Sequence, residues 1–295
     1  MLGAAIRSLL FVPGDKEALI LKALSSRADA VIIDLEDAVA PDNKPMARAI
    51  TRQVLDGADR AGKAVFVRLN AYDTAQTAAD IAAVLGGRPW GVVLPKCEGA
   101  HDLERLSHQL DVMETREGIE LGATRIMTVA TETAAATLGL GNPRGVERLW
   151  GMLWGGEDLA AALGAGSNRD DAGAYTFPYQ FARSQCLYAA KALGAVAVDA
   201  VYTDFRDSSG LTVETRVGLR DGFSAKAAIH PAQVDVINEI MSPNAEQLGW
   251  ARQVVSLLRD NAVARLDGRM IDLAHKRIAE GLLARETAIA GLSGK

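Results

Sequence analysis

The 295-residue chain has little of what several classes of protein need. Its only cysteines, Cys97 and Cys186, lie far apart and in no metal-like spacing, which predicts two reduced thiols. No apolar run approaches the ~18 residues of a membrane-spanning helix, and the apolar run near the N-terminus is too short for the core of a signal peptide. We therefore expect a cytoplasmic protein with no membrane association.

A block of basic residues is also missing. Acidic and basic residues are interleaved, and the formal net charge is −5. No stretch is therefore suited to follow a phosphate backbone, and nucleic-acid binding is not expected. Net acidity does not exclude an anionic substrate, because the local field of a site decides which charge it binds. An apolar content of 49% fits an ordinary globular chain.

Eight short apolar runs, several of them rich in β-branched residues, alternate with amphipathic helical stretches. Several runs are almost continuously apolar, as expected for parallel strands that are buried on both faces. Eight strand–helix units predict an α/β fold, the (β/α)8 TIM barrel. A doubly wound open sheet is the alternative, but it usually has fewer strands, and no GxGxxG follows the first run. The runs span residues 8–13, 30–37, 65–70, 91–96, 125–132, 148–155, 195–204 and 223–231.

The pattern changes after the eighth run. Residues 244–266 and 271–292 are predicted to form two helices joined by the sequence DGRM at 267–270, and no further strand is expected. We therefore predict a barrel catalytic domain over residues 1–241 and a C-terminal helical extension over residues 242–295.

Polar and charged residues gather where the predicted strands end. Catalytic groups of such barrels lie at the carboxyl ends of the strands, so these side chains are expected to meet at one mouth. The set comprises Asp15, Glu36, Asp37, Arg68, Asn70, Lys96, Glu132, Glu157, Asp158, Asp204 and His230.

Glu132 and Asp158 are the strongest pair in this set. Carboxylate oxygens are hard ligands, and two of them on neighbouring strands, with room for water and substrate, describe a Mg²⁺ site better than a zinc site. Gly155 and Gly156 would allow a tight turn and a close approach to a ligand, and the amides of the next helix would face an anion. The alternative is that Glu157 or Asp158 simply caps that helix.

Arg68, at the end of the third run, would point into this acidic mouth. Its planar guanidinium suits a bidentate grip on a substrate carboxylate; alternatively, or in addition, it neutralises Glu36 or Asp37. The stretch DLED at 34–37, which contains both acids, either orients Arg68 and metal-bound water or forms a solvated charge cluster. His230 is a weaker candidate for a base, and a structural role or a place near a thioester is favoured for it.

Seven blocks of the chain, in order, resemble the citrate lyase β-subunit and malyl-CoA lyase branch of the HpcH/HpaI aldolase superfamily. The resemblance implies a (β/α)8 barrel with a C-terminal helical extension that packs on a neighbouring subunit of a homotrimer or homohexamer. It also implies Mg²⁺ and a CoA or acyl-carrier thioester as substrate. The blocks are RSLLFVPGDKEALILKAL, ADAVIIDLEDAVAPDNK, VRLN, VVLPKCEG, ATETAAA, WGGEDLAA and AIHPAQVDVINEIMSP.

The resemblance also implies roles for individual residues. Glu132 and Asp158 would bind the metal, and Arg68 would bind the keto-acid carboxylate. Asp272, in the stretch DGRMID, would be the acid/base acting in the neighbouring subunit's site. Further substrate contacts are expected from Glu132, Glu36, Asp37, Gly156 and Glu157, and contacts to CoA from Arg7, Lys16, His230 and Pro231.

The reaction implied is Mg²⁺-dependent cleavage or formation of the C–C bond of citramalyl-CoA or malyl-CoA. Cleavage would give acetyl-CoA and pyruvate or glyoxylate, and formation would start from them. A malyl-CoA thioesterase on the same scaffold is one alternative. A citrate lyase β-type subunit that acts on an acyl-carrier-protein thioester is another. The presence of DGRMID favours a stand-alone CoA enzyme, although Leu273 and Ala274 depart from the pair that relatives usually have there.

Overall fold

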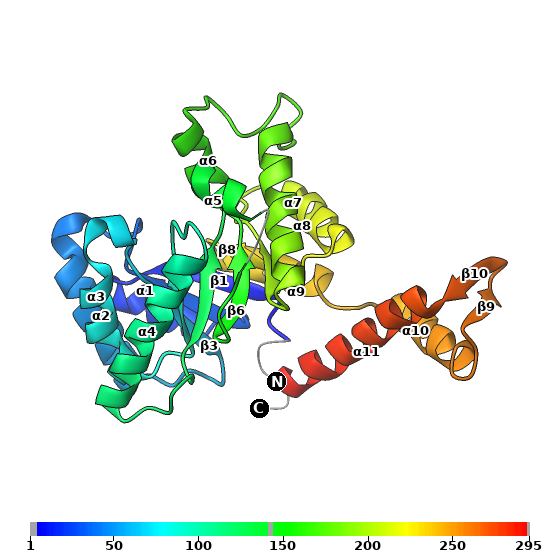
Figure 1. Cartoon of the computed structure of the whole chain (residues 1–295), viewed down its shortest axis with the longest axis horizontal. Helices are drawn as coiled ribbons and strands as arrows, with labels where there is room; N and C mark the ends of the chain where they lie inside the picture. Colours follow the sequence, from blue (N-terminus) through cyan, green and yellow to red (C-terminus); the bar gives the residue numbers. More distant parts are fainter. Residues whose placement is uncertain (1–4, 141–143, 294–295) are drawn as a thin grey trace.

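A computed structural model describes residues 5–140 and 144–293 (Figure 1). Eight parallel strands pair in sequence order, and β1 also pairs with β8, which closes the barrel. The predicted (β/α)8 fold is confirmed. The strands are β1 (Ser8–Pro13), β2 (Ala30–Asp34), β3 (Ala64–Arg68), β4 (Gly91–Leu94), β5 (Arg125–Val129), β6 (Leu149–Leu153), β7 (Val196–Asp199) and β8 (Ala225–Ala228).

Helices surround the barrel and then continue into the C-terminal part of the chain (Figure 1). Short 3-10 turns lie at Pro41–Asn43, Tyr72–Thr74, Leu85–Gly87 and Pro231–Gln233. The α-helices are α1 (Glu17–Leu24), α2 (Lys44–Gly57), α3 (Thr77–Val84), α4 (Ala100–Glu117), α5 (Ala134–Gly139), α6 (Gly156–Leu163), α7 (Phe177–Ala192), α8 (Ser208–Asp221), α9 (Val234–Ile240), α10 (Ala245–Leu257) and α11 (Leu273–Ser293).

The strands hold together because both of their faces are buried. One face fills the barrel interior with residues such as Ile32, Phe66 and Met127, and the other packs against the helices through residues such as Val31 and Val67. These alternate faces explain why the strands are almost continuously apolar in the sequence. The packed interior leaves the functional groups to the loops at the carboxyl ends of the strands.

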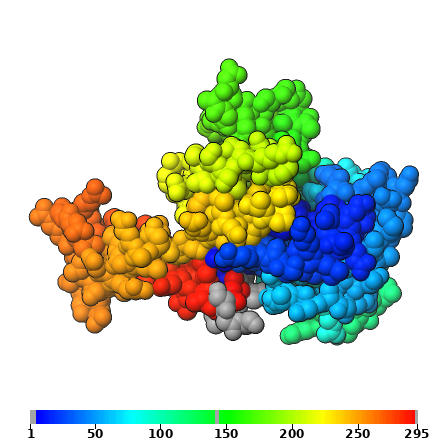
Figure 2. Space-filling view, turned by 180° about the vertical axis from the view of Figure 1, so that it is seen from behind, coloured from blue at the N-terminus to red at the C-terminus, as the bar shows by residue number. Residues whose placement is uncertain are grey.

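The C-terminal part forms an arm that stands clear of the barrel (Figures 1 and 2). The expectation of two helices with no further strand is wrong in one respect. An antiparallel hairpin of β9 (Val263–Leu266) and β10 (Arg269–Asp272) separates α10 from α11. Its two-residue loop is Asp267-Gly268, with φ of 49° and 77°, which is the backbone a tight hairpin turn needs.

Helix α11 runs from the hairpin back to the amino-terminal end of the barrel. Its Arg285 donates hydrogen bonds to the carbonyl oxygens of Met241 and Ser224, at 2.9 and 2.5 Å. The arm also has a small apolar core of its own, which includes Val254, Leu258 and Ile271. The division of the chain at residue 241 stays a prediction.

Among the described residues, none of the helices is both long and apolar enough to span a bilayer.

Candidate active site

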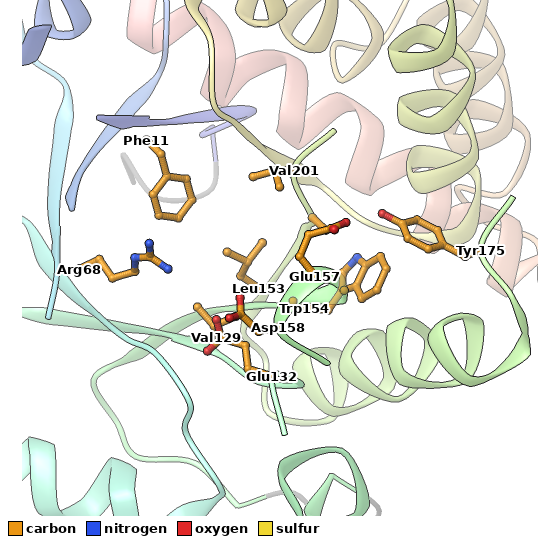
Figure 3. A pocket seen from close by; sticks show the side chains of 13 residues that line it. Phe11, Arg68, Val129, Glu132, Leu153, Trp154, Glu157, Asp158, Tyr175 and Val201 are labelled. Atoms are coloured by element: carbon orange, nitrogen blue, oxygen red, sulfur yellow. The ribbon is translucent and has the colours of Figure 1, made fainter. Parts of the chain in front are cut away.

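A pocket at the carboxyl end of the barrel brings together four of the residues that were predicted to meet, Arg68, Glu132, Glu157 and Asp158 (Figure 3). Arg68 points in from β3, and Glu132 and Asp158 lie on the opposite side, after β5 and β6. The remaining wall is mostly apolar, with Phe11 and Leu153 among its side chains. The site therefore combines a guanidinium group with two carboxylates in a largely apolar wall.

Glu132 is almost completely buried, with 3% of its surface exposed. Its Oε2 accepts a hydrogen bond of 2.5 Å from the backbone N–H of Lys96. Burial raises the pKa of Glu132 to about 8, with the neighbouring carboxylates of Glu36 and Asp158 adding to the rise while the Lys96 N–H and Arg68 oppose it. The ionised form of Glu132 therefore lacks enough compensating positive charge.

Asp158 lies in the first turn of α6 and is half-buried. The N-cap of this helix is Gly155, so the interpretation of Glu157 or Asp158 as its capping residue is wrong. Glu157 is exposed and accepts a hydrogen bond of 2.8 Å from the Asn168 side chain. Asp158 is therefore free of a capping role and lines the pocket with Glu132.

The glycine pair before Asp158 is required by close packing. A Cβ on Gly155 would lie 2.7 Å from Cγ of Glu132, and a Cβ on Gly156 would lie 2.9 Å from the Trp154 ring. Two non-bonded carbon atoms do not approach each other this closely in a packed protein unless one of them shifts. The turn can therefore bring Asp158 against Glu132 only because both positions lack a side chain.

The donor set fits Mg²⁺. Among the residues that the structure describes, no group of three or more His, Cys, Asp or Glu side chains gathers in a metal-like cluster, whereas Mg²⁺ is usually held by one or two carboxylates and keeps several waters. Glu132 and Asp158 supply those two carboxylates from adjacent strand ends. A divalent cation would also compensate the buried charge of Glu132.

Arg68 is held in place by acids that line up behind it. Asp34, its register partner on β2, accepts hydrogen bonds from Nε at 2.7 Å and from Nη2 at 2.6 Å. Glu36 lies 2.9 Å from Nη1, while Asp37 is 3.9 Å away and exposed. Burial opposes the charge of Arg68, but Asp34 and Glu36 outweigh it and raise the pKa of Arg68.

One of the two interpretations therefore holds for Glu36 and the other for Asp37. Glu36 is buried and orients Arg68, whereas Asp37 belongs to the solvated surface. Burial raises the pKa of Glu36, and Arg68 and Lys96 oppose that rise. Arg68 neutralises these acids and still faces the pocket with its guanidinium, so its two predicted roles are compatible (Figure 3).

Lys96 connects the two halves of the site. Its backbone takes a left-handed conformation, φ 49°, which directs its N–H to Glu132 while its Nζ lies 2.5 Å from Oε1 of Glu36. Burial opposes its charge, but Glu36 raises the pKa of Lys96 to about 12. Lys96 was predicted only to lie at a strand end, with no role of its own. Asp34, the first residue of the stretch DLED at 34–37, orients Arg68 as one interpretation of that stretch predicted.

The four residues expected to contact CoA lie in different places. Lys16 is exposed at the carboxyl end of β1, and His230 and Pro231 are exposed beyond β8, where the His230 ring stacks on Phe205 with centroids 4.6 Å apart. The expectation for Arg7 is wrong for this barrel mouth. Arg7 precedes β1, at the opposite end of the barrel.

The guanidinium of Arg7 has a structural partner at that end. Its Nε and Nη2 donate to the Asp29 carboxylate, each at 2.8 Å, and its Nη1 donates to the Ser242 hydroxyl at 2.9 Å. A residue that precedes a barrel strand lies on the face that serves stability. Arg7 therefore ties the start of β1 to the segment that follows α9.

Asp272 ends β10, on the arm, and does not line the pocket of its own chain (Figure 1). Its carboxylate is hydrogen-bonded to Nδ1 of His275 at 2.8 Å and accepts a hydrogen bond from the Ala274 N–H. The His275 hydrogen bond lowers the pKa of Asp272. The structure thus places the predicted acid/base apart from the predicted metal ligands of the same chain.

Comparison with known proteins identifies the family of the chain. Residues 7–231 match the family described as HpcH/HpaI aldolase/citrate lyase. A (3S)-malyl-CoA thioesterase of Cereibacter sphaeroides is 33% identical over 289 residues, which cover 96% of this chain and 95% of that protein. The mitochondrial citramalyl-CoA lyase of Rattus norvegicus is 30% identical over 298 residues, which cover 96% and 86%.

A solved structure also resembles the whole chain. CitE from Mycobacterium tuberculosis, in complex with magnesium, acetoacetate and coenzyme A, superposes with a TM-score of 0.81 at 35% identity and covers 97% of this chain and 99% of its own. The family match covers most of the sequence, and the relatives align with nearly all of it. The chain therefore belongs to the HpcH/HpaI aldolase/citrate lyase family of enzymes.

Proposed function

We propose that the protein is a Mg²⁺-dependent lyase that cleaves, or forms, the C–C bond of a 3-hydroxyacyl-CoA. Citramalyl-CoA or malyl-CoA would give acetyl-CoA and pyruvate or glyoxylate. The observation that carries the proposal is the placement of Arg68 across one pocket from Glu132 and Asp158. The magnesium, acetoacetate and coenzyme A bound to the related CitE support the same chemistry.

The residues of the pocket divide the work. Arg68 would grip the carboxylate of the keto acid, and Asp34 and Glu36 fix the plane of its guanidinium. Glu132 and Asp158 would hold Mg²⁺, which when bound would lower the pKa of the substrate hydroxyl and polarise the same oxygen as it becomes a carbonyl. The apolar wall, with Phe11 and Leu153, would limit the access of water to the reacting carbon.

Asp272 of a neighbouring subunit, in a homotrimer or homohexamer, would transfer the proton to or from the reacting carbon. The arm holds Asp272 away from its own pocket, so an arm that packs on the next subunit would complete that subunit's site. Asp272 would protonate the enolate carbon during cleavage, or take a proton from the thioester methyl group during condensation. The hydrogen bond from His275 favours the ionised carboxylate that condensation needs.

Subunit mixing tests this arrangement. Asp272→Ala should abolish turnover and leave Mg²⁺ binding unchanged, whereas Glu132→Ala should lose both. Mixing the two inactive proteins should restore part of the activity, because some sites would then combine an intact pocket with an intact arm. Native mass spectrometry of the mixture measures both the oligomeric state and the subunit exchange. Exchange without rescue would show that Asp272 does not act between subunits.

A malyl-CoA thioesterase is the second candidate, favoured by the 33% identity to a protein of that activity. In that reaction water attacks the thioester carbonyl and no C–C bond breaks. Incubating the protein and Mg²⁺ with malyl-CoA and, separately, with citramalyl-CoA distinguishes the two. Acetyl-CoA with keto acid identifies a lyase, and free CoA with an intact hydroxy acid identifies a thioesterase.

The same assay addresses the need for an acyl carrier protein. Turnover of the CoA thioesters by the purified chain alone would exclude an obligatory carrier partner. Lys16, His230 and Pro231 lie exposed beyond strands β1 and β8, and we propose that they contact the CoA. Lys16→Ala should then raise KM for the thioester and leave kcat nearly unchanged.

A further inference from the structure

A buried cluster of ionic side chains lies behind the pocket wall, at the ends of β6 and β7 and within β8. Its centre is Asp199, the last residue of β7, which is 1% exposed. Asp199 accepts hydrogen bonds from Nε1 of Trp154 at 2.7 Å and from Nε and Nη2 of Arg183 at 3.0 and 3.1 Å. Burial opposes its charge, but Lys226 and Arg183 lower the pKa of Asp199 to about 2. Asp199 is therefore an ionised acceptor near neutral pH.

The other half of the cluster is built on Lys226 of β8, which is completely buried. Its Nζ donates to the carbonyl oxygen of Ala200 at 2.7 Å and to Glu214 at 2.9 Å, and it lies 3.5 Å from Asp199. Glu214 also pairs with Arg169 at 2.6 Å, and the Arg169 guanidinium lies 3.8 Å over the Tyr175 ring. The cluster continues to a second pocket-lining aromatic residue.

Each branch of the cluster ends on a residue that lines the candidate active-site pocket. Asp199 holds Trp154, Lys226 holds Ala200, and Arg169 holds Tyr175. Buried ion pairs are not an efficient source of stability, because apolar residues of the same volume often do as well. What the cluster does supply is fixed geometry, since each buried charge constrains the groups that satisfy it.

Trp154 transmits this geometry to the metal site. It directly precedes the glycine pair, and its ring occupies the space where a side chain on Gly156 would lie. The Trp154 ring also packs edge-on against Tyr175, with centroids 4.9 Å apart. The turn that carries Asp158 thus rests on a ring whose only polar atom, Nε1, is bound to Asp199.

We propose that Asp199 is a positioning residue that acts through Trp154 to set the place of Asp158 as a metal ligand. This inference rests on the proposed function, in which Glu132 and Asp158 bind the metal. Residues that orient a metal ligand typically contribute 10–100-fold to metal affinity. Here the constraint would act through the backbone turn after Trp154, since Asp199 has its hydrogen bonds to Trp154 and Arg183 rather than to Asp158.

Mn²⁺ binding to the purified, metal-free protein tests the proposal, with free Mn²⁺ measured by electron paramagnetic resonance. Trp154→Phe keeps an aromatic ring, although a smaller one, and every charge of the cluster, but removes the N–H that Asp199 binds. We expect Mn²⁺ affinity to fall about tenfold. Turnover at saturating Mg²⁺ should recover most of its wild-type value, which separates weakened metal binding from general damage. Asp199→Asn should weaken Mn²⁺ binding at least as much as Trp154→Phe does.

Two variants at the other end of the barrel serve as matched controls. Trp90→Phe makes the same change beside Phe66, and Glu114→Gln neutralises a buried carboxylate paired with Arg148 at 2.6 Å. Both controls should change Mn²⁺ affinity less than about twofold, even where they lower the melting temperature. If Asp199→Asn fails to fold, Trp154→Phe alone decides the question.

The outcomes separate this inference from the proposed function. If the wild type binds Mn²⁺ and Glu132→Gln abolishes the binding, the metal site stands. Unchanged affinity in Trp154→Phe would then overturn only the role of Asp199, and so would an equal loss in the Trp90→Phe control. If the wild type binds no Mn²⁺, the proposed metal site is wrong, and the role of Asp199 that rests on it is wrong as well.

Discussion

Replacement of Glu132 by glutamine should change how stability depends on pH in the metal-free protein. The pKa of Glu132 is raised from its usual 4.5 to about 8, so the folded state binds this proton more tightly than the unfolded state does. The stability that the proton supplies is complete below pH 4.5 and is lost as the pH rises through 8. Glutamine does not titrate, so the variant should escape this loss.

The size of the effect follows from the displacement of the pKa. A change from 4.5 to about 8 corresponds to about 5 kcal/mol of lost stability once Glu132 is fully ionised. For a chain of this size, 1 kcal/mol moves the melting temperature by roughly 2–4 °C. Between pH 5 and pH 9, the melting temperature of the wild type in EDTA should therefore fall by about 10 °C more than that of Glu132→Gln.

Mg²⁺ should stabilise the wild type more than it stabilises Glu132→Gln. A divalent cation favours the ionised carboxylate, so Mg²⁺ should raise the melting temperature of the wild type most strongly above pH 8 and raise that of Glu132→Gln little. Differential scanning fluorimetry from pH 5 to pH 9, with EDTA and with Mg²⁺, measures all four curves. Parallel curves for the two proteins in EDTA, or equal stabilisation of both by Mg²⁺, would refute the reasoning.

Two further substitutions probe the same site. Gly155→Ala places a methyl group 2.7 Å from Cγ of Glu132 and should weaken Mn²⁺ binding about tenfold or more. The control Gly166→Ala, where no atom lies within 4 Å of the added methyl group, should leave Mn²⁺ binding unchanged. Equal effects of the two substitutions would count against the close packing of Gly155. Lys96→Met removes the 2.5 Å pairing with Glu36 but keeps the backbone N–H to Glu132, so KM for the keto acid in the condensation assay should rise several-fold while Mn²⁺ affinity changes little.

The barrel was predictable because its strands are marked by composition alone. Strands such as β2 are buried on both faces, so they are continuous apolar runs that no amphipathic helix would produce. The ends of the strands were less predictable. The run 30–37 was expected to be strand throughout, yet β2 ends at Asp34, because pairing with the neighbouring strands decides where a strand stops.

The hairpin of the arm was missed although its signal was present. Asp267-Gly268 between two short runs is a strong local indication of a two-residue turn. The apolar periodicity before it favoured one long helix over residues 244–266. The structure instead ends α10 at Leu257, which leaves β9 to pair with β10.

The candidate metal ligands were predictable because acids shortly after buried strands are unusual, and Glu132 and Asp158 follow β5 and β6 within a few residues. Their surroundings could not be found in the same way. The pairing of Arg68 with Asp34 depends on the register of β3 against β2, which the sequence does not display. The error over Arg7 had a different source, because its position before a strand already indicated the opposite end of the barrel.

The charges at the mouth of the barrel suggest the order in which the metal and the keto acid bind. Five carboxylates, those of Asp34, Glu36, Asp37, Glu132 and Asp158, surround the cations of Arg68 and Lys96. Near neutral pH, where the raised pKa of Glu132, about 8, keeps it mostly protonated, the group carries a net charge of about −2, and when all are ionised it carries −3; both charges oppose the entry of an anionic keto acid. A divalent cation would reduce the charge of the fully ionised group to −1 and leave Arg68 as the remaining attraction for the carboxylate. We therefore expect metal binding to precede, and to permit, binding of the keto acid.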